Sequence, residues 1–359
     1  MPAIRLTGLL LIATALIFAA SLGDRAKAFA QATTAKPKIT APKIAAPVPV
    51  PPPSPAPAEA TEPSKVKVGM YITQLYDFDM AKRSFSVTFW GWFIHADQKY
   101  KPLENVEIVN AKSSTVKFSA VLPKETKEGT VYWDQAKYSA IIGQDWDIQK
   151  FPFDTQKLII NLEDGVNDTT STVFVADSAN TNIDSSVKIP GWSIESLEIK
   201  SSDTVYNTTF GDPTLQGSST YSKISAIITV KREGFRLLLS TFIGFFVAFA
   251  LVSLTYFIDT EWMAGSRVGL CGGAIFASVG NMYVINNYLP PVSIFTLADA
   301  IEASTFVTII FAILTVVMVK ALKDIKKPEL AERMNTVCAA ISLISYPAFN
   351  MWAIYQATS

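Results

Sequence analysis

Four long apolar stretches near the C-terminal end limit what this chain can fold into. They run over residues 235–258, 268–289, 297–322 and 335–355. Each is close to the about 20 residues that a helix needs to cross the hydrocarbon core of a bilayer. Only 17% of the 359 residues are charged, where about 25% is usual for a soluble domain, and the mean hydropathy is +0.27. We therefore predict a four-helix, all-α transmembrane domain over residues 233–359.

The charge balance and the scarcity of histidine exclude several functions. Lysine and arginine total 31 and aspartate and glutamate total 31, so the zero net charge argues against a nucleic-acid partner. A single histidine, His95, gives little basis for a histidine metal site or a Ser-His-Asp triad. The two cysteines exclude a disulfide-rich scaffold. We expect neither an enzyme nor a bound metal or cofactor.

The N-terminal segment is typical of a secretory signal. Arg5 precedes an apolar run over 9–20, and Ala28-Phe29-Ala30 forms a small-x-small cleavage site, which predicts a signal peptide over residues 1–30. The alternative is an uncleaved anchor helix, although the apolar run is short for a membrane span. Residues 31–64 are rich in alanine, proline and lysine, so we expect an extended linker there.

Residues 65–232 have the pattern of a strand-rich domain. Short apolar and β-branched runs over 85–94, 106–109, 116–121, 158–162 and 224–230 alternate with polar turns. Such spacing predicts an antiparallel β-sandwich or barrel. The link between the last two apolar stretches carries an excess of basic residues, which favours the cytoplasmic side and leaves the strand domain outside the membrane.

Several short segments occur in an order that is typical of one family. Residues 151–156 read Phe-Pro-Phe-Asp-Thr-Gln, and Gly191-Trp192, Arg232, Leu289-Pro290, Val292-Ser293 and Asp299 follow. From residue 66 to the C-terminus, this set resembles the pentameric ligand-gated ion channels of the Cys-loop receptor superfamily. Gln144 and Leu158 stand where animal receptors have the loop cysteines, and the last link is short, so the resemblance is to the prokaryotic branch.

The resemblance implies a homopentameric receptor of the bacterial inner (cell) membrane. Its β-sandwich extracellular domain, in the periplasm, would bind a small-molecule agonist or a proton, and inorganic ions would pass through a pore surrounded by membrane lipid. The alternative is a non-conducting, membrane-anchored periplasmic sensor or binding protein on the same scaffold. A conducting protein needs a hydrated pore along the second apolar stretch, whereas a binding scaffold can pack that helix shut.

One face of the second apolar stretch is rich in small and polar residues. When a helix turns about 100° per residue, these residues fall within an arc of roughly 80°. They are Gly265, Gly269, Gly273, Phe276, Gly280, Tyr283 and Asn287. Matched to the family, this face lines the pore and five copies of Phe276 form an apolar gate that closes by dewetting. The alternative is close packing of helices through the small-xxx-small spacing.

The sign of the permeant ion stays open from the sequence. The stretch Arg267-Val268-Gly269-Leu270 resembles anion-selective members of the family, whereas Asp259 and Glu261 lie close by in the short inner link.

The resemblance also implies which residues pass a signal from the sandwich to the helices. These are Asp154, Phe153, Arg232, Pro290, Asp79 and Lys82. An Asp154–Arg232 ion pair at the domain junction is the main coupling hypothesis. The alternative is a solvated surface aspartate, with an arginine that simply ends a helix at the lipid headgroups.

An agonist site is implied between subunits, under a hairpin over 201–221. Tyr206, Phe210 and Tyr221 on the hairpin, with Trp133 on a strand, are the candidate aromatic walls for a cationic amine. Aromatic residues at strand spacing are also ordinary core residues, which is the competing interpretation. His95 is expected to be a hydrogen-bonded strand residue rather than a proton sensor.

Overall fold

The computed structural model describes residues 62–127, 129–211, 217–258, 264–290 and 293–358. The expected signal peptide and nearly all of the expected linker lie outside the described residues, as do Asp259 and Glu261.

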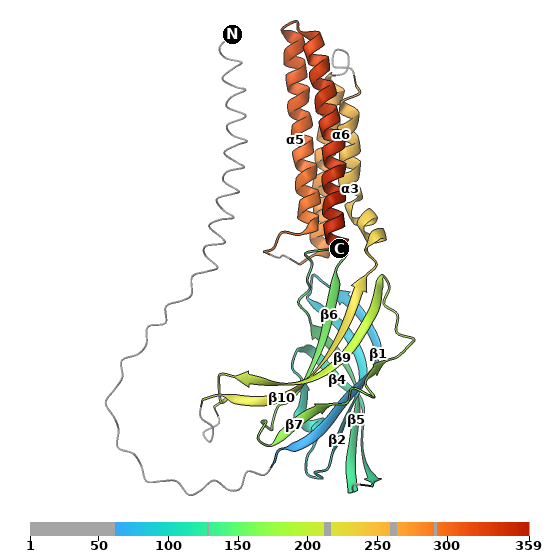
Figure 1. Ribbon diagram of the computed structural model, residues 1–359, viewed down its shortest axis with the longest axis vertical. Helices are drawn as coiled ribbons and strands as arrows, with labels where there is room; N and C mark the ends of the chain where they lie inside the picture. Colours follow the sequence, from blue (N-terminus) through green and yellow to red (C-terminus); the bar gives the residue numbers. More distant parts are fainter. Residues whose placement is uncertain (1–61, 128, 212–216, 259–263, 291–292, 359) are drawn as a thin grey trace, which may run out of the picture. The chain divides into compact units, whose positions relative to one another are not determined.

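Two β-sheets form the N-terminal part of the described chain (Figure 1). The six-stranded sheet has the order β4-β5-β2-β1-β7, with β8 also paired to β1. Its strands are β1 (Ser64–Asp79), β2 (Ser84–His95), β4 (Ala111–Thr126), β5 (Gly129–Gly143), β7 (Thr172–Ala176) and β8 (Asn182–Ile183). The second sheet has the order β3-β6-β10-β9, with β3 (Val106–Ile108), β6 (Thr155–Asp164), β9 (Trp192–Tyr206) and β10 (Ser219–Arg232). The short helix α2 (Pro102–Asn105) precedes β3.

Every second side chain of a core strand fills the space between the two sheets. On β10, Ile224, Ala226, Ile228 and Val230 are fully buried and the residues between them are not. This period of two is what a strand with one core face requires. Most neighbouring strands are antiparallel, as expected, but β7 and β8 pair with β1 in parallel.

One apolar run was interpreted correctly as a strand but does not contribute to the core. Residues 116–121 lie on β4, which is the outermost strand of the six-stranded sheet. Val116, Phe118 and Val121 are all exposed. Because an edge strand has a neighbour on one side only, its apolar side chains can remain uncovered in a single chain.

Four helices follow the sheets: α3 (Gly234–Thr255), α4 (Ala264–Tyr288), α5 (Leu297–Asp324) and α6 (Pro328–Thr358). All four are long and apolar enough to cross a membrane. Helix α3 packs against α4 and α5. Helices α5 and α6 pack side by side (Figure 1). Asp299 forms a capping box with Thr296 at the start of α5, which gives this acid a local structural role.

Candidate functional site

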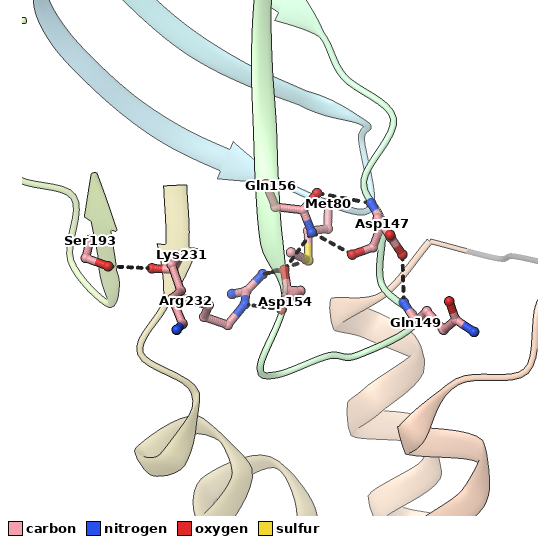
Figure 2. A network of polar contacts seen from close by, with 8 residues as sticks. All are labelled: Met80, Asp147, Gln149, Asp154, Gln156, Ser193, Lys231 and Arg232. Atoms are coloured by element: carbon pink, nitrogen blue, oxygen red, sulfur yellow. Dashed lines mark hydrogen bonds and ion pairs between the residues drawn. The ribbon is translucent and has the colours of Figure 1, made fainter. Parts of the chain in front are cut away.

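The loop between β5 and β6, residues 144–154, joins the sheets to the helices. Gln156 fixes its shape, because its side chain accepts from the Asp147 N–H at 3.0 Å and donates to the Asp147 carbonyl at 2.6 Å (Figure 2). The loop contains a cis Phe151–Pro152 peptide bond, and Phe151 is buried. The loop is thus partly buried, and hydrogen bonds to Gln156 hold its backbone in one shape.

Asp154 and Arg232 form a bidentate ion pair at this junction (Figure 2). The Arg232 Nε donates to Asp154 Oδ1 at 2.7 Å, and Nη2 donates to Oδ2 at 3.2 Å. Gln156 Nε2 also donates to Oδ2, at 2.7 Å. Asp154 is only 2% exposed, so the alternative of a solvated aspartate does not hold. The expected contact is present, and its part in coupling stays a prediction.

Arg232 is also held by three further residues. Its guanidinium lies 3.9 Å from the ring centre of Trp192 and 5.1 Å from that of Phe151. Nη2 lies 3.3 Å from the Met80 sulfur in the turn between β1 and β2. Cations over aromatic faces are stabilised by the ring quadrupole, so the arginine is bound on several sides. A single side chain therefore links both sheets and stands two residues before α3.

The same loop touches both α3 and α5. A Cβ on Gly234, the first residue of α3, would collide with the Pro152 carbonyl oxygen and lie 2.9 Å from the Phe153 ring. The Leu297 N–H at the start of α5 donates to the Gln149 carbonyl at 3.0 Å. Phe153 thus packs against the start of α3, and its part in coupling stays a prediction. Glycine at position 234 permits a backbone approach that no other residue allows.

Asp79, Lys82 and Pro290 line two cavities at this junction. Asp79 and Lys82 form an ion pair at 3.0 Å and border a cavity of about 950 Å³, which we call the junction cavity. A hydrogen bond from the Lys82 N–H lowers the pKa of the Asp79 carboxyl. Pro290 is buried and borders a second cavity of about 260 Å³, beside Ile148 of the loop. We call this the α4–α5 cavity.

The predicted pore stripe of α4 is largely uncovered in the single chain. Phe276 is 80% exposed and Tyr283 is also exposed, whereas Ile275 is 38% exposed. Nothing lies within 4 Å of a Cβ built on Gly265, Gly269 or Gly280. These three glycines therefore do not serve close helix packing within one chain. Gly273 differs, since its Cβ would meet Leu251 at 3.6 Å, and Asn287 is exposed.

The close approach of α3 and α4 depends on a different glycine. A Cβ on Gly244 would lie 2.6 Å from Asn281 Cβ, and the Gly244 N–H donates to Asn281 Oδ1 at 2.9 Å. Sequence spacing alone does not reveal this contact with α4.

Arg267 does not lie on the exposed stripe of α4. Its side chain is buried, where Nε donates to the Thr255 carbonyl at 2.6 Å and Nη2 donates to Asn335 Oδ1 at 2.6 Å. Asn335 in turn donates to the Tyr256 carbonyl at 2.8 Å. The arginine thus ties the end of α3 to α6, as a cation near a helix C-terminus does. Residues 267–270 resemble anion-selective members of the family, but the Arg267 charge is buried and does not lie on the exposed stripe.

Three of the four predicted ligand residues form one cluster. The ring centres of Tyr206 and Phe210 are 5.3 Å apart, and Tyr221 lies 5.9 Å from Tyr206 and 6.2 Å from Phe210. Trp133 lies on the other sheet, with the Lys124 ammonium 5.5 Å from its ring centre. Among the described residues, no ring contact joins Trp133 to the cluster within one chain.

Glu163 borders this cluster and was not found from the sequence. Tyr206 donates its phenol proton to Glu163 Oε1 at 2.8 Å, and burial together with that carboxylate raises the pKa of Tyr206 to about 12. Glu163 is 4% exposed, and its Oε2 has no hydrogen-bond partner among the described residues. Glu163 follows apolar Leu162 and precedes Asp164, which is equally buried, so the pattern gave no signal that separates the two acids.

His95 is a buried strand residue with a hydrogen bond, as expected. Its Nδ1 lies 2.8 Å from the Asp97 carbonyl, and Nε2 lies 3.5 Å from Asp134 Oδ2. Burial raises the pKa of Asp134.

No protein-family model matches this chain, and no curated protein is significantly similar to it. The fold itself defines the class: a multi-pass membrane protein with a β-sheet domain ahead of four apolar helices.

Proposed function

We propose that this protein is a homopentameric, ligand-gated ion channel of a bacterial inner membrane, with its sheet domain in the periplasm. The exposed stripe of α4 carries the proposal. Glycine in a helix interior costs about 1 kcal/mol relative to alanine, and a face of glycine backbone with tyrosine and asparagine has little to gain from lipid tails. When five α4 helices surround one axis, this face lines the axis and contacts water instead of lipid.

The proposed gate is Phe276, the most exposed apolar side chain of the stripe. Five Phe276 rings, one from each subunit, narrow a pore that is otherwise lined by glycine. An apolar constriction excludes water and so blocks ions without a physical plug. Opening then requires only that α4 tilts or turns enough to separate the rings.

A single strand connects the ligand cluster to the helices. β10 carries Tyr221 near its start and Arg232 at its end, and α3 begins two residues later. At about 3.3 Å per residue these two residues lie roughly 35 Å apart along the strand. A ligand that moves the hairpin therefore acts on Arg232 through a continuous hydrogen-bonded strand, and on the first turns of α3 and α5 through the loop that Arg232 holds.

The ligand that suits the cluster is a cationic amine. Three aromatic rings lie together with their planes at 65–68° to one another, and Glu163 adds a buried carboxylate oxygen without a hydrogen-bond partner among the described residues. Both features attract a cation that leaves water. In the pentamer, Trp133 of an adjacent subunit would close the site, since it lies on the opposite sheet. A proton acting as agonist is the competing case.

Currents across planar bilayers that contain the purified protein test this function. We expect amine-evoked currents in the wild type, and a higher amine requirement for Glu163→Gln, because the amide removes the negative charge. Acid steps distinguish proton activation, and the reversal potential in a salt gradient gives the sign of the permeant ion. Amine binding by a pentamer that never conducts would instead support a sensor.

A further inference from the structure

Arg236, on the first turn of α3, is exposed and makes no hydrogen bond or ion pair with any described residue. It lines the junction cavity, where the other cations are engaged. Arg232 holds Asp154, Lys82 holds Asp79, and the Lys112 ammonium donates to the Lys82 carbonyl at 2.5 Å. Arg236 is therefore the cation of this cavity that is left to bind a group from outside the chain.

Glu302, on the second turn of α5, is the acid whose charge complements that of Arg236. It is half-buried and borders the α4–α5 cavity together with Asn286 and Asp299. Asp299 is engaged, since its Oδ2 accepts from the Thr296 N–H and the Thr296 hydroxyl, both at 2.7 Å. Glu302 makes no hydrogen bond or ion pair within the described part of the chain. An ionised side chain inside an apolar helix is costly without a partner.

The two cavities flank the outer end of α4. Asn286 borders the cavity of Glu302, and the next two residues, Asn287 and Tyr288, border the cavity of Arg236. Arg236 is the third residue of α3, and Glu302 is the sixth residue of α5. At 1.5 Å per residue Arg236 lies about 3 Å and Glu302 about 7.5 Å from the first residue of its helix, which is within the reach of two long side chains. One flank of the chain thus presents a cation and the other an anion, each within two turns of the start of its helix.

We propose that Arg236 of one subunit pairs with Glu302 of the next around the ring. This inference rests on the proposed pentamer. A ring with five identical heterologous contacts requires two different faces that are complementary to each other, and these flanks meet that condition. Within one chain the competing acids are Asp77 and Glu233, which share the junction cavity, and neither forms an ion pair with Arg236 in the structure. The five pairs hold the outer ends of α3 and α5 of adjacent subunits together.

Crosslinking between subunits tests the contact. Arg236→Cys and Glu302→Cys are combined in a protein whose native Cys271 and Cys338 are replaced by alanine and whose pentamer is verified by native mass spectrometry. A short bis-maleimide reagent is suitable, because an Arg–Glu pair holds its Cβ atoms farther apart than the about 4 Å of a disulfide. We expect a ladder of bands up to the pentamer on a denaturing gel. Either cysteine alone, and the pair Leu239→Cys with Val307→Cys on other exposed positions of the same helices, should give no ladder.

Charge reversal supplies the second readout. Arg236→Glu or Glu302→Arg alone should reduce the pentamer fraction, and the double reversal should restore it. Stable wild-type pentamers without the specific ladder and without restoration overturn the ion pair and leave the channel proposal standing. In that case Arg236 faces another anion, such as a lipid phosphate. Wild-type protein that never forms pentamers overturns both proposals.

Discussion

Replacing Asp154 with asparagine should destabilise the protein by about 3–5 kcal/mol, because it leaves Arg232, whose side chain is only 10% exposed, without its counter-charge. The new amide also brings an N–H group into a position surrounded by donors. Oδ2 now accepts from Gln156 Nε2 and Arg232 Nη2, and Oδ1 accepts from Arg232 Nε. Whichever way the amide turns, one donor must face another donor.

The same substitution at Asp145 is a matched control. Asp145 lies on the same loop, but its side chain is 94% exposed and its ion pair with Arg83 spans 3.6 Å. Exposed pairs contribute about 0–1 kcal/mol, so Asp145→Asn should have little effect.

Thermal unfolding, followed by tryptophan fluorescence in detergent, measures the difference. For a domain of this size, 1 kcal/mol shifts the midpoint by about 2–4 °C, so Asp154→Asn should lower it by roughly 10 °C. Arg232→Lys should give an intermediate loss, since it keeps the charge but loses the fork geometry and the stacking on Trp192. Equal, small shifts for Asp154→Asn and Asp145→Asn would show that the junction does not depend on this pair.

Three further outcomes follow from the structure. Gly244→Ala should destabilise the helix bundle, since its Cβ lies 2.6 Å from Asn281 Cβ, and Asn281→Ala should relieve only part of that loss; an unchanged melting temperature would contradict the close approach. Glu163→Gln should weaken amine binding measured by calorimetry, whereas equal binding by both proteins would exclude Glu163 from the site. In the folded protein the Tyr206 phenol should lose its proton only near pH 12. Because the same phenol in the unfolded chain ionises near pH 10, the free energy of unfolding should fall between pH 10 and about 12. Ultraviolet absorbance of phenolate, compared with Tyr206→Phe, measures this titration, and a normal titration would contradict the buried contact with Glu163.

The membrane helices and most strands could be predicted from the sequence alone. A span needs about 20 apolar residues whatever its neighbours are, so the expected stretches 235–258 and 297–322 agree closely with α3 and α5. The core strand 224–230 likewise lies within β10, because alternating burial is a local property of a strand. The contact between Asp154 and Arg232 was also expected, but from the family resemblance rather than from physical pattern.

Contacts between distant segments could not be predicted in the same way. The stretch that begins at Arg267 resembles anion-selective channels, yet the Arg267 side chain turns into the helix bundle to meet Thr255 and Asn335. The direction of a side chain near a helix end depends on which neighbouring helices offer acceptors, and the sequence of α4 does not contain that information. The partnership of Glu163 with Tyr206 has the same origin, since the two residues lie on strands that are not neighbours in the sheet.

The central claim is that the exposed stripe of α4 lines an ion pore with Phe276 as its gate. Unitary and macroscopic currents across planar bilayers, recorded without agonist for wild type, Phe276→Ala and Ile275→Ala, test it most directly. The account predicts a basal leak for Phe276→Ala, since five missing rings let water into the constriction. Ile275→Ala should lower thermal stability with little leak, since residue 275 is turned about 100° away and is half as exposed. A leak from Ile275→Ala but not from Phe276→Ala would contradict this register of the helix, and an absence of current from all three proteins in every ligand would contradict the channel itself.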